Sequence, residues 1–278
     1  MIQATKMQET GNNQIQNKSL SIRICAGGLS FCVYTPTDKS PYKYVEYRIK
    51  PTISLAANLK EALQNEDILK APYKRVNILI TNTHFTVVPT MAFNSDNIED
   101  IYKYNFPKDK ANHVSFNVLR RSGIAIIFGF DKNVYQLLLD DFPNARFYAS
   151  ASTLIEYLSE KSLSGKGKKM FAYVHENEMT LFCFNQGRMI FINSFESKNT
   201  EDNQYYILNV WKNLGMDQLE DKLCIVGDCD NRYELADKMS MFVKDVTLMD
   251  RENDYKYTKA MKTAMIPYDL QTLLVCGL

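Results

Sequence analysis

Two glycines and two glutamates are the first residues in this sequence whose types and spacing could do chemistry. Gly27-Gly28, with Ser30 two positions on, could present backbone N–H groups and a hydroxyl to phosphate oxygens. About 150 residues later, Glu176 and Glu178 lie in a short polar stretch next to a histidine, which titrates near neutral pH. Both stretches also fit a simpler interpretation, a tight turn between two strands with solvated side chains.

A third stretch places Asp228 and Asp230 at the spacing of two calcium ligands, but it lacks the glycine and the distal glutamate of an EF-hand loop. Asp230 or Asn231 could instead cap the helix that is predicted to follow. The sequence has no P-loop, nucleophile elbow or dinucleotide-binding fingerprint. Its six cysteines have no zinc-ligand spacing, which predicts buried thiols and no metal site.

The composition limits the classes of partner. The chain has 278 residues, with 33 Lys and Arg against 32 Asp and Glu, so its net charge is +1. No overall field attracts it to nucleic acid or anionic lipid, and no apolar run approaches the ~20 residues of a membrane helix. We expect a cytoplasmic protein without membrane insertion or a specific nucleic-acid partner. The lysines at 166, 168 and 169 lie in a predicted linker, where they could contact phosphate or simply be solvated.

Apolar residues alternate from Leu20 onward and predict a β-hairpin. Gly-Gly suits the positive φ angles of a type I′ turn, so we expect Gly27-Gly28 to form a two-residue loop that pairs Ile24 with Phe31. A strand over 44–49, a helix that begins after Ser54 and a strand over 76–81 follow.

The same order returns after a shift of 150 residues, which places Ala26 on Glu176. A hairpin whose register pairs His175 with Thr180 leads to a turn at 185–188, a strand over 189–195, a helix ended by Gly215 and a strand over 223–226. The chain therefore contains β-β-β-α-β twice. Between the two copies we expect helices over 96–105, 133–139 and 152–162, a strand pair over 114–119 and 124–128, and a strand over 146–149.

Two tandem β-β-β-α-β units, each with a tight first hairpin, resemble the actin-like ATPase superfamily. Within it, the stretches FNQGRMIFINSFE, KLCIVGD and PNARFYASASTLIEYL are similar to the cytoplasmic scaffold proteins of pilus assembly and type II secretion, and to a degenerate bacterial family of this fold. The resemblance implies an α/β fold of two duplicated ribonuclease-H-like lobes with a cleft between them. It implies a first lobe with an inserted α/β subdomain over 19–163 and a second lobe over 164–278. Residues 1–18 are polar and rich in Gln and Asn, so we expect an irregular N-terminal lead-in there.

The resemblance also implies where a nucleotide would bind. Functional members carry an aspartate in the first turn of each lobe, and a glycine-rich turn of the second lobe packs on the adenosine. Ala26 stands where the first aspartate is expected, Glu176 stands near the second, and Gly227 matches one glycine while Asp228 replaces its neighbour. The candidate cleft residues are thus Gly27, Gly28, Ser30, Glu176, Gly227 and Asp228.

The missing aspartate favours a non-catalytic binding or scaffold protein, a pseudoenzyme without a cofactor whose partner is another protein. The alternative is an ATPase or small-molecule kinase that uses Glu176 with ATP and magnesium. Binding of nucleic acid by the linker lysines is the third hypothesis, and it predicts a steep dependence on salt.

Overall fold

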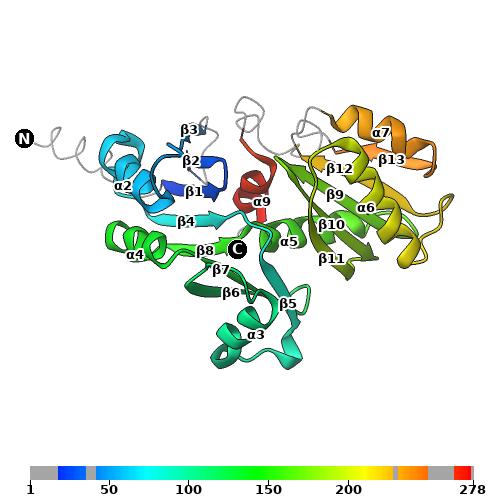
Figure 1. The fold of residues 1–278 in the computed structure, drawn as a ribbon, viewed down its shortest axis with the longest axis horizontal. Coiled ribbons are helices and arrows are strands. Elements are labelled where there is room, and N and C mark those ends of the chain that lie inside the picture. Colours follow the sequence, from blue (N-terminus) through cyan, green and yellow to red (C-terminus); the bar gives the residue numbers. More distant parts are fainter. Residues whose placement is uncertain (1–17, 36–41, 228–230, 250–265, 277–278) are drawn as a thin grey trace, which may run out of the picture. The chain divides into compact units, whose positions relative to one another are not determined.

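The computed structural model describes residues 18–35, 42–227, 231–249 and 266–276. The chain forms two compact units, each drawn in Figure 1. The first unit comprises Met1–Asn117, Ala125–Ser150 and Tyr257–Ile266, and the second comprises Val118–Ile124, Ala151–Lys256 and Pro267–Leu278. Residues 151–163, which the sequence assigned to the first lobe, therefore cluster with the second unit.

The first unit is built on a five-stranded mixed sheet. Its strand order is β3-β2-β1-β4-β8, with β1 antiparallel to β2 and parallel to β4. The strands are β1 (Ser19–Cys25), β2 (Gly28–Tyr34), β3 (Lys43–Arg48), β4 (Arg75–Ile80) and β8 (Arg146–Ala149). One face is apolar across the sheet, since Ile22 lies opposite Phe31 and Ile78, and Ile78 lies opposite Phe147.

Two helices, α2 (Leu55–Asn65) and α4 (Lys132–Asp141), lie side by side in contact. Tyr135 of α4 packs on Phe147 with ring centroids 4.9 Å apart, which places this helix layer on the apolar face. The cap predicted for α2 is confirmed, because the Ser54 hydroxyl accepts a hydrogen bond from the Ala57 N–H at 3.2 Å. The short 3₁₀ helix η1 (Asp67–Leu69) follows α2.

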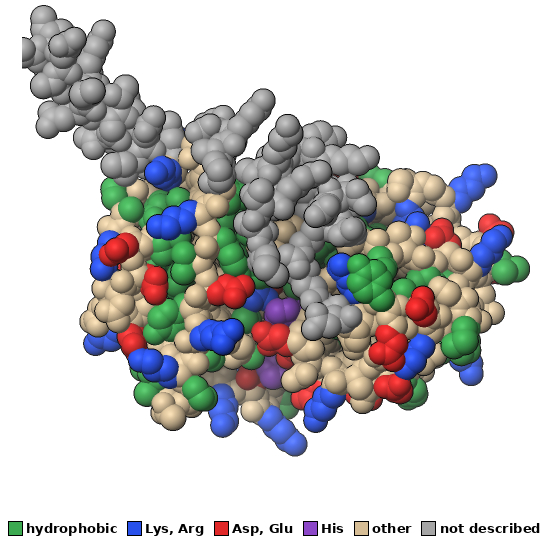
Figure 2. All heavy atoms as spheres, turned by 90° about the horizontal axis from the view of Figure 1, so that it is seen from above, with side chains coloured by type: hydrophobic (Ala, Val, Ile, Leu, Met, Phe, Trp, Pro, Cys, Tyr) green, Lys and Arg blue, Asp and Glu red, His purple; other side chains and the backbone are tan. Residues whose placement is uncertain are grey.

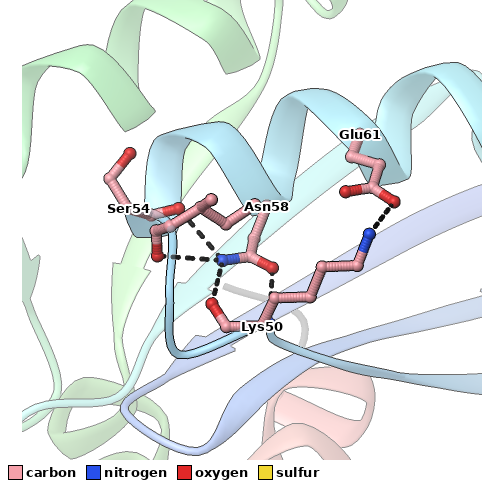
Figure 3. A network of polar contacts seen from close by, with 5 residues as sticks. Lys50, Ser54, Asn58 and Glu61 are labelled. Atoms are coloured by element: carbon pink, nitrogen blue, oxygen red, sulfur yellow. Dashed lines mark hydrogen bonds and ion pairs between the residues drawn. The ribbon is translucent and has the colours of Figure 1, made fainter.

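Asn58 connects the start of α2 to the residues that precede it through side-chain hydrogen bonds (Figure 3). Its Oδ1 accepts from the Lys50 N–H at 2.7 Å, and its Nδ2 donates to the carbonyls of Lys50, Ile53 and Ser54. The side chain is 1% exposed, so these four hydrogen bonds replace water in full.

A small subdomain is inserted between β4 and α4. Its three-stranded sheet has the order β5-β7-β6 and accompanies helix α3. The elements are β5 (Phe85–Pro89), η2 (Thr90–Ala92), η3 (Ser95–Asn97), α3 (Ile98–Asn105), β6 (His113–Leu119) and β7 (Ile124–Phe130). Asn117 of β6 forms two hydrogen bonds with the backbone of the edge strand β8. Its Nδ2 donates to Phe147 O at 2.8 Å and its Oδ1 accepts from Ala149 N at 2.9 Å.

The second unit repeats the sheet of the first. Its strand order, β11-β10-β9-β12-β13, has the same pattern of antiparallel and parallel pairs, so the predicted duplication of β-β-β-α-β is confirmed. The strands are β9 (Lys168–His175), β10 (Glu178–Asn185), β11 (Arg188–Glu196), β12 (Lys222–Gly227) and β13 (Asp245–Leu248).

Helices cover both faces of this second sheet. Trp211 of α6 (Thr200–Asn213) and Met239 of α7 (Arg232–Ser240) share one core with the Ala172 face of β9. On the opposite face, Tyr268 of α9 (Tyr268–Cys276) packs near Tyr173 of β9 and near Tyr157 of α5 (Ser150–Ser162). The unit is therefore a three-layer α/β/α sandwich.

Two lysines of the predicted linker, Lys168 and Lys169, donate hydrogen bonds to carbonyls at the ends of helices. The linker is shorter than expected, because β9 begins at Lys168. The Lys168 Nζ donates to the carbonyls of Leu214 and Gly215 at the end of α6, and the Lys169 Nζ donates to Ser164 O and Lys161 O at the end of α5. Cations at these carbonyls complement the helix dipoles.

Surface charge and cysteines are as the composition suggests. Acidic and basic side chains are interspersed on the face shown in Figure 2, without a large area of one sign.

Four of the five described cysteines are buried and all five are free thiols. Burial raises the pKa of Cys32 and of Cys183 to about 12. Within the described ranges, no helix is long and apolar enough to cross a membrane.

Candidate functional site

The first hairpin turn of the first unit consists of Ala26 and Gly27, not of the predicted Gly27-Gly28. Cys25 pairs with Gly28, and Ile24 pairs with Leu29 instead of Phe31, so the predicted register is wrong by two residues. Neither Ala26 nor Gly27, nor the predicted turn residue Gly28, has a positive φ, which also excludes the predicted type I′ geometry. Gly28 has a different role, because a Cβ there would lie 3.1 Å from the Tyr47 carbonyl of the neighbouring strand.

A buried arginine lies behind this turn. Arg23 is 4% exposed at the centre of the sheet, and its Nη1 donates to the Cys25 Sγ at 3.0 Å. Ser30 lies opposite Arg23 inside β2 and is 5% exposed, so the hydroxyl is within the strand and not at the turn. The side chains from Cys25 to Gly28 include no carboxylate.

Arg23 was not among the predicted site residues. Its alternation with apolar residues predicted a residue on the second face of a hairpin, where charge is normally solvated. The sheet order makes β1 the central strand, and all seven of its residues are buried. The feature of the sequence that could have indicated Arg23 is a charged residue in the middle of the first strand of a repeat.

The corresponding turn of the second unit consists of Glu176 and Asn177. His175 pairs with Glu178 and not with Thr180, so this register too is displaced by two residues. Glu176 has φ +52°, a left-handed conformation that non-glycine residues seldom adopt. Its Oε1 lies 3.3 Å from the His175 Nε2, and its side chain is 41% exposed. The shift of 150 residues nevertheless places Ala26 and Glu176 at equivalent turn positions.

Gly227 ends β12 in tight contact with β9. It has φ +112°, and a Cβ there would lie 2.2 Å from the Val174 carbonyl oxygen. The Arg232 Nη1 donates to the Gly227 carbonyl at 3.3 Å. Strand packing by itself accounts for this glycine, because the space that a side chain would take is filled by backbone.

The neighbouring predictions fall partly outside the described residues. Asp228 and Asp230 both lie outside them. Asn231 precedes α7 but makes no capping hydrogen bond, and its Nδ2 donates to the Thr200 Oγ1 at 3.2 Å. The predicted capping by Asn231 is therefore wrong.

The structure places the site residues of each unit separately. In the first unit, Gly27 and Gly28 lie at the hairpin with Ser30 two residues beyond Gly28. In the second unit, both Gly227 and the Glu176 turn adjoin the end of β9, since Gly227 pairs with Val174. Their role as cleft residues stays a prediction.

Two sheets of identical strand order, each opening with a two-residue hairpin, define the class: the protein has an actin-like ATPase fold. The chain belongs to the family described as "Protein of unknown function (DUF3822)", whose model matches residues 7–246. No curated protein matches the chain.

Solved structures support the same class. A Bacteroides thetaiotaomicron VPI-5482 protein with an actin-like ATPase fold and unknown function is 34% identical, with a TM-score of 0.83 over 95% of this chain and 98% of that one. The PilM–PilN type IV pilus biogenesis complex is 9% identical, with a TM-score of 0.60 over 93% of this chain and 97% of that one. At that identity the second likeness concerns the fold alone.

Proposed function

We propose that this protein is a non-catalytic binding or scaffold protein on a degenerate actin-like ATPase fold. The first turn carries the proposal: Ala26 occupies the position of the expected aspartate, and the buried side chain that contacts Cys25 beside this turn, Arg23, is positively charged. A magnesium ion held beside a triphosphate requires carboxylate oxygens, which a guanidinium cannot supply. The residues of this turn do not fit a magnesium-bound nucleotide.

Two further observations support the proposal. Gly227 is the glycine expected to pack on an adenosine, and the Val174 carbonyl already fills the space beside it. The first turn is two residues long, so it offers few N–H groups to surround a phosphate. No cofactor is part of the proposed function.

The proposed partner is another protein, and the proposed location is the cytoplasm. The PilM structure is a complex with PilN, which is a property of that pair. A first turn without the expected carboxylate, on a fold whose two sheets are intact, supports a binding role here. The oligomeric state is not part of the proposal.

Calorimetry with the full chain tests this function. We expect no heat of binding when ATP and magnesium are titrated to millimolar concentration, and no phosphate release. Ala26→Asp serves as the reciprocal variant: if the missing carboxylate is the only defect, this variant gains magnesium-dependent nucleotide binding. Saturable ATP binding by the unmodified protein would overturn the proposal.

The alternative function, an ATPase or small-molecule kinase, depends on Glu176. Its position at the tip of the second turn, exposed and in a left-handed conformation, is the observation that favours it. It predicts magnesium-dependent ATP turnover that Glu176→Gln abolishes. Glu178→Gln, two residues away in the first position of β10, is the matched control and should leave the turnover unchanged.

A further inference from the structure

Strand β11 forms one edge of the second sheet (Figure 1). It pairs with β10 on one side, and on the other side no backbone group of a described residue is hydrogen-bonded to it. With nine residues, Arg188–Glu196, it is the longest strand in the described part of the chain. An edge of this length presents a row of N–H and C=O groups with which another strand can pair.

The hairpin determines which backbone groups of β11 point outward. Neighbouring residues of an antiparallel strand direct their N–H and C=O groups alternately to its two sides. The Ser197 N–H donates to the Asn177 carbonyl at 2.8 Å, so the backbone of Ser197 faces the β10 side. Counting back from Ser197 along the regular register, every second residue also faces β10, and the residues between them face outward: Glu196, Ser194 and Ile192.

β11 lacks the features that usually protect an edge strand. It contains no lysine or proline, and its two charged residues, Arg188 and Glu196, stand at its ends. A register shift near its start leaves residues 191–196 in regular pairing with β10. The other edges of the two five-stranded sheets are short or charged, since β8 and β13 have four residues each and β3 contains Lys43, Glu46 and Arg48. A long, regular and uncharged edge favours the addition of a strand.

The charges of β11 are complementary to those of a second β11 in antiparallel orientation. Arg188 begins the strand, Glu196 ends it, and both side chains are exposed. Antiparallel pairing of two copies therefore brings the positive end of each strand beside the negative end of the other. Glu196 also lies opposite Glu178 of β10, an unfavourable pair of like charges that an arginine from a second copy would relieve.

We propose that β11 is a self-association surface, at which two copies of this protein pair their β11 strands in antiparallel orientation and so join their second sheets. A twofold axis at Asn193 sets the register. Ile192 of each copy then exchanges backbone hydrogen bonds with Ser194 of the other, and the two exposed Asn193 amides meet at the axis, where they can bond to each other. Phe191 lies opposite Phe195 of the second copy, which covers the exposed parts of two half-buried rings.

β11 contains none of the candidate cleft residues, so this surface goes beyond the proposed function and does not depend on it. Sedimentation equilibrium of the full chain tests the self-association. A single strand pair buries less area than a standard protein interface, so we expect a monomer–dimer equilibrium with a dissociation constant on the order of 10 µM. A protein that stays monomeric up to about 500 µM, far above that constant, would overturn the proposal.

A lysine at the twofold axis tests the register. Asn193→Lys places two like charges opposite each other and should raise the dissociation constant of the dimer at least about tenfold. The residue is exposed, so the monomer should stay folded. Asn209→Lys, the same substitution at an exposed residue of α6, is the matched control and should leave the dissociation constant unchanged. Equal dissociation constants for the two variants would contradict the proposal.

Exchange of the two end charges distinguishes a second copy from a different protein partner. Arg188→Glu and Glu196→Arg should each weaken the dimer about tenfold, because the twofold axis makes every change act twice. The double variant restores both opposite-charge contacts and should dimerise within about threefold of the unmodified protein. A double variant as weak as the single variants would contradict antiparallel self-pairing.

Hydrogen exchange at residue resolution locates the contact. The outward N–H groups of Ile192, Ser194 and Glu196 should become protected as the protein concentration rises through the dissociation constant. The inward N–H groups of Asn193 and Phe195 should be protected at every concentration, because they face β10. Outward N–H groups whose exchange does not depend on concentration would overturn the assignment to β11.

Discussion

Asn58 and Asn77 show how unequal two buried side chains of one type can be. Asn58 makes four hydrogen bonds to backbone at the start of α2. Asn77, 3% exposed in the middle of β4, has an Oδ1 that no described residue contacts by a hydrogen bond. Both side-chain amides lose hydrogen bonds to water on folding, but only the Asn58 amide replaces all of them with hydrogen bonds to the protein.

Replacing each asparagine by leucine, which has a similar volume, separates the two cases. We expect Asn58→Leu to lower the free energy of unfolding by about 3 kcal/mol, because it strands several backbone groups. Asn77→Leu should raise it by about 1 kcal/mol, because it removes an unsatisfied amide oxygen. Urea titrations measure both, and a destabilised Asn77→Leu would mean that Oδ1 has a partner such as bound water.

Of the described glycines, Gly227 would have the shortest contact from an added Cβ, 2.2 Å to the Val174 carbonyl oxygen. Gly227→Ala should cost about 3 kcal/mol, because its Cβ would overlap the Val174 carbonyl and its φ is positive. Gly165→Ala is the control: Gly165 also has a positive φ of +80°, but nothing lies within 4 Å of its Cβ position, so about 1 kcal/mol is expected. Thermal unfolding of both variants gives the comparison, and equal losses would contradict the steric argument.

At the scale of elements, the carboxylate of Asp109, which follows α3, connects the parts of the inserted subdomain. Burial by itself would raise the pKa of Asp109, but the hydrogen bond from the Tyr102 hydroxyl, the nearby His84 and the N–H groups of Lys110 and Ala111 lower it further than burial raises it. The His84 Nδ1 is 3.3 Å from the Asp109 Oδ2. The ionised carboxylate therefore connects α3, the loop before β6 and the loop before β5.

The sign of the pKa shift sets the pH dependence of this contact. A carboxyl group with a lowered pKa stabilises the fold above its unfolded pKa of about 4, and that contribution is lost as the pH falls through the folded value. Asp109→Asn should therefore destabilise the protein at pH 6, and the gap from the unmodified protein should narrow as the pH falls below about 4. Urea midpoints at pH 6 and at several values below about pH 4 measure the gap, and a gap independent of pH would contradict the assignment.

At the scale of the whole molecule, the second unit is completed by a helix that begins more than 90 residues after β9 ends. Tyr268 of α9 is fully buried near Tyr157 and Tyr173. The Thr153 Oγ1 donates to Asp269 O and accepts from the Thr272 Oγ1, which joins α9 to α5. One face of the second sheet thus depends on residues close to the end of the chain.

Truncation of this tyrosine tests that dependence. Tyr268→Ala should lower the free energy of unfolding by about 4 kcal/mol through the cavity that it leaves. Tyr205→Ala, at a residue 64% exposed on α6, should change it by no more than about 0.5 kcal/mol. Similar losses in both variants would show that α9 contributes little to the second unit.

Local patterns in the sequence were enough for the duplicated order, the Ser54 cap, the turn at Gln186-Gly187 and the end of α6 before Gly215. Each of these depends on residues close together in the chain, and so does the absence of a carboxylate at Ala26. The register of the first hairpin was predicted wrongly because Gly27-Gly28 was taken as the turn, whereas Gly28 already pairs with Cys25. The shift of 150 residues carried the same error to the hairpin of the second unit.

Only the tertiary structure decided which polar residues are buried and what surrounds them. Arg23 lies on the central strand because β4 pairs beside β1. Helix α9 is buried on nearly every side, so it has no amphipathic pattern to reveal it. Burial and charge environment are sums over non-local neighbours, and no short stretch of sequence contains them.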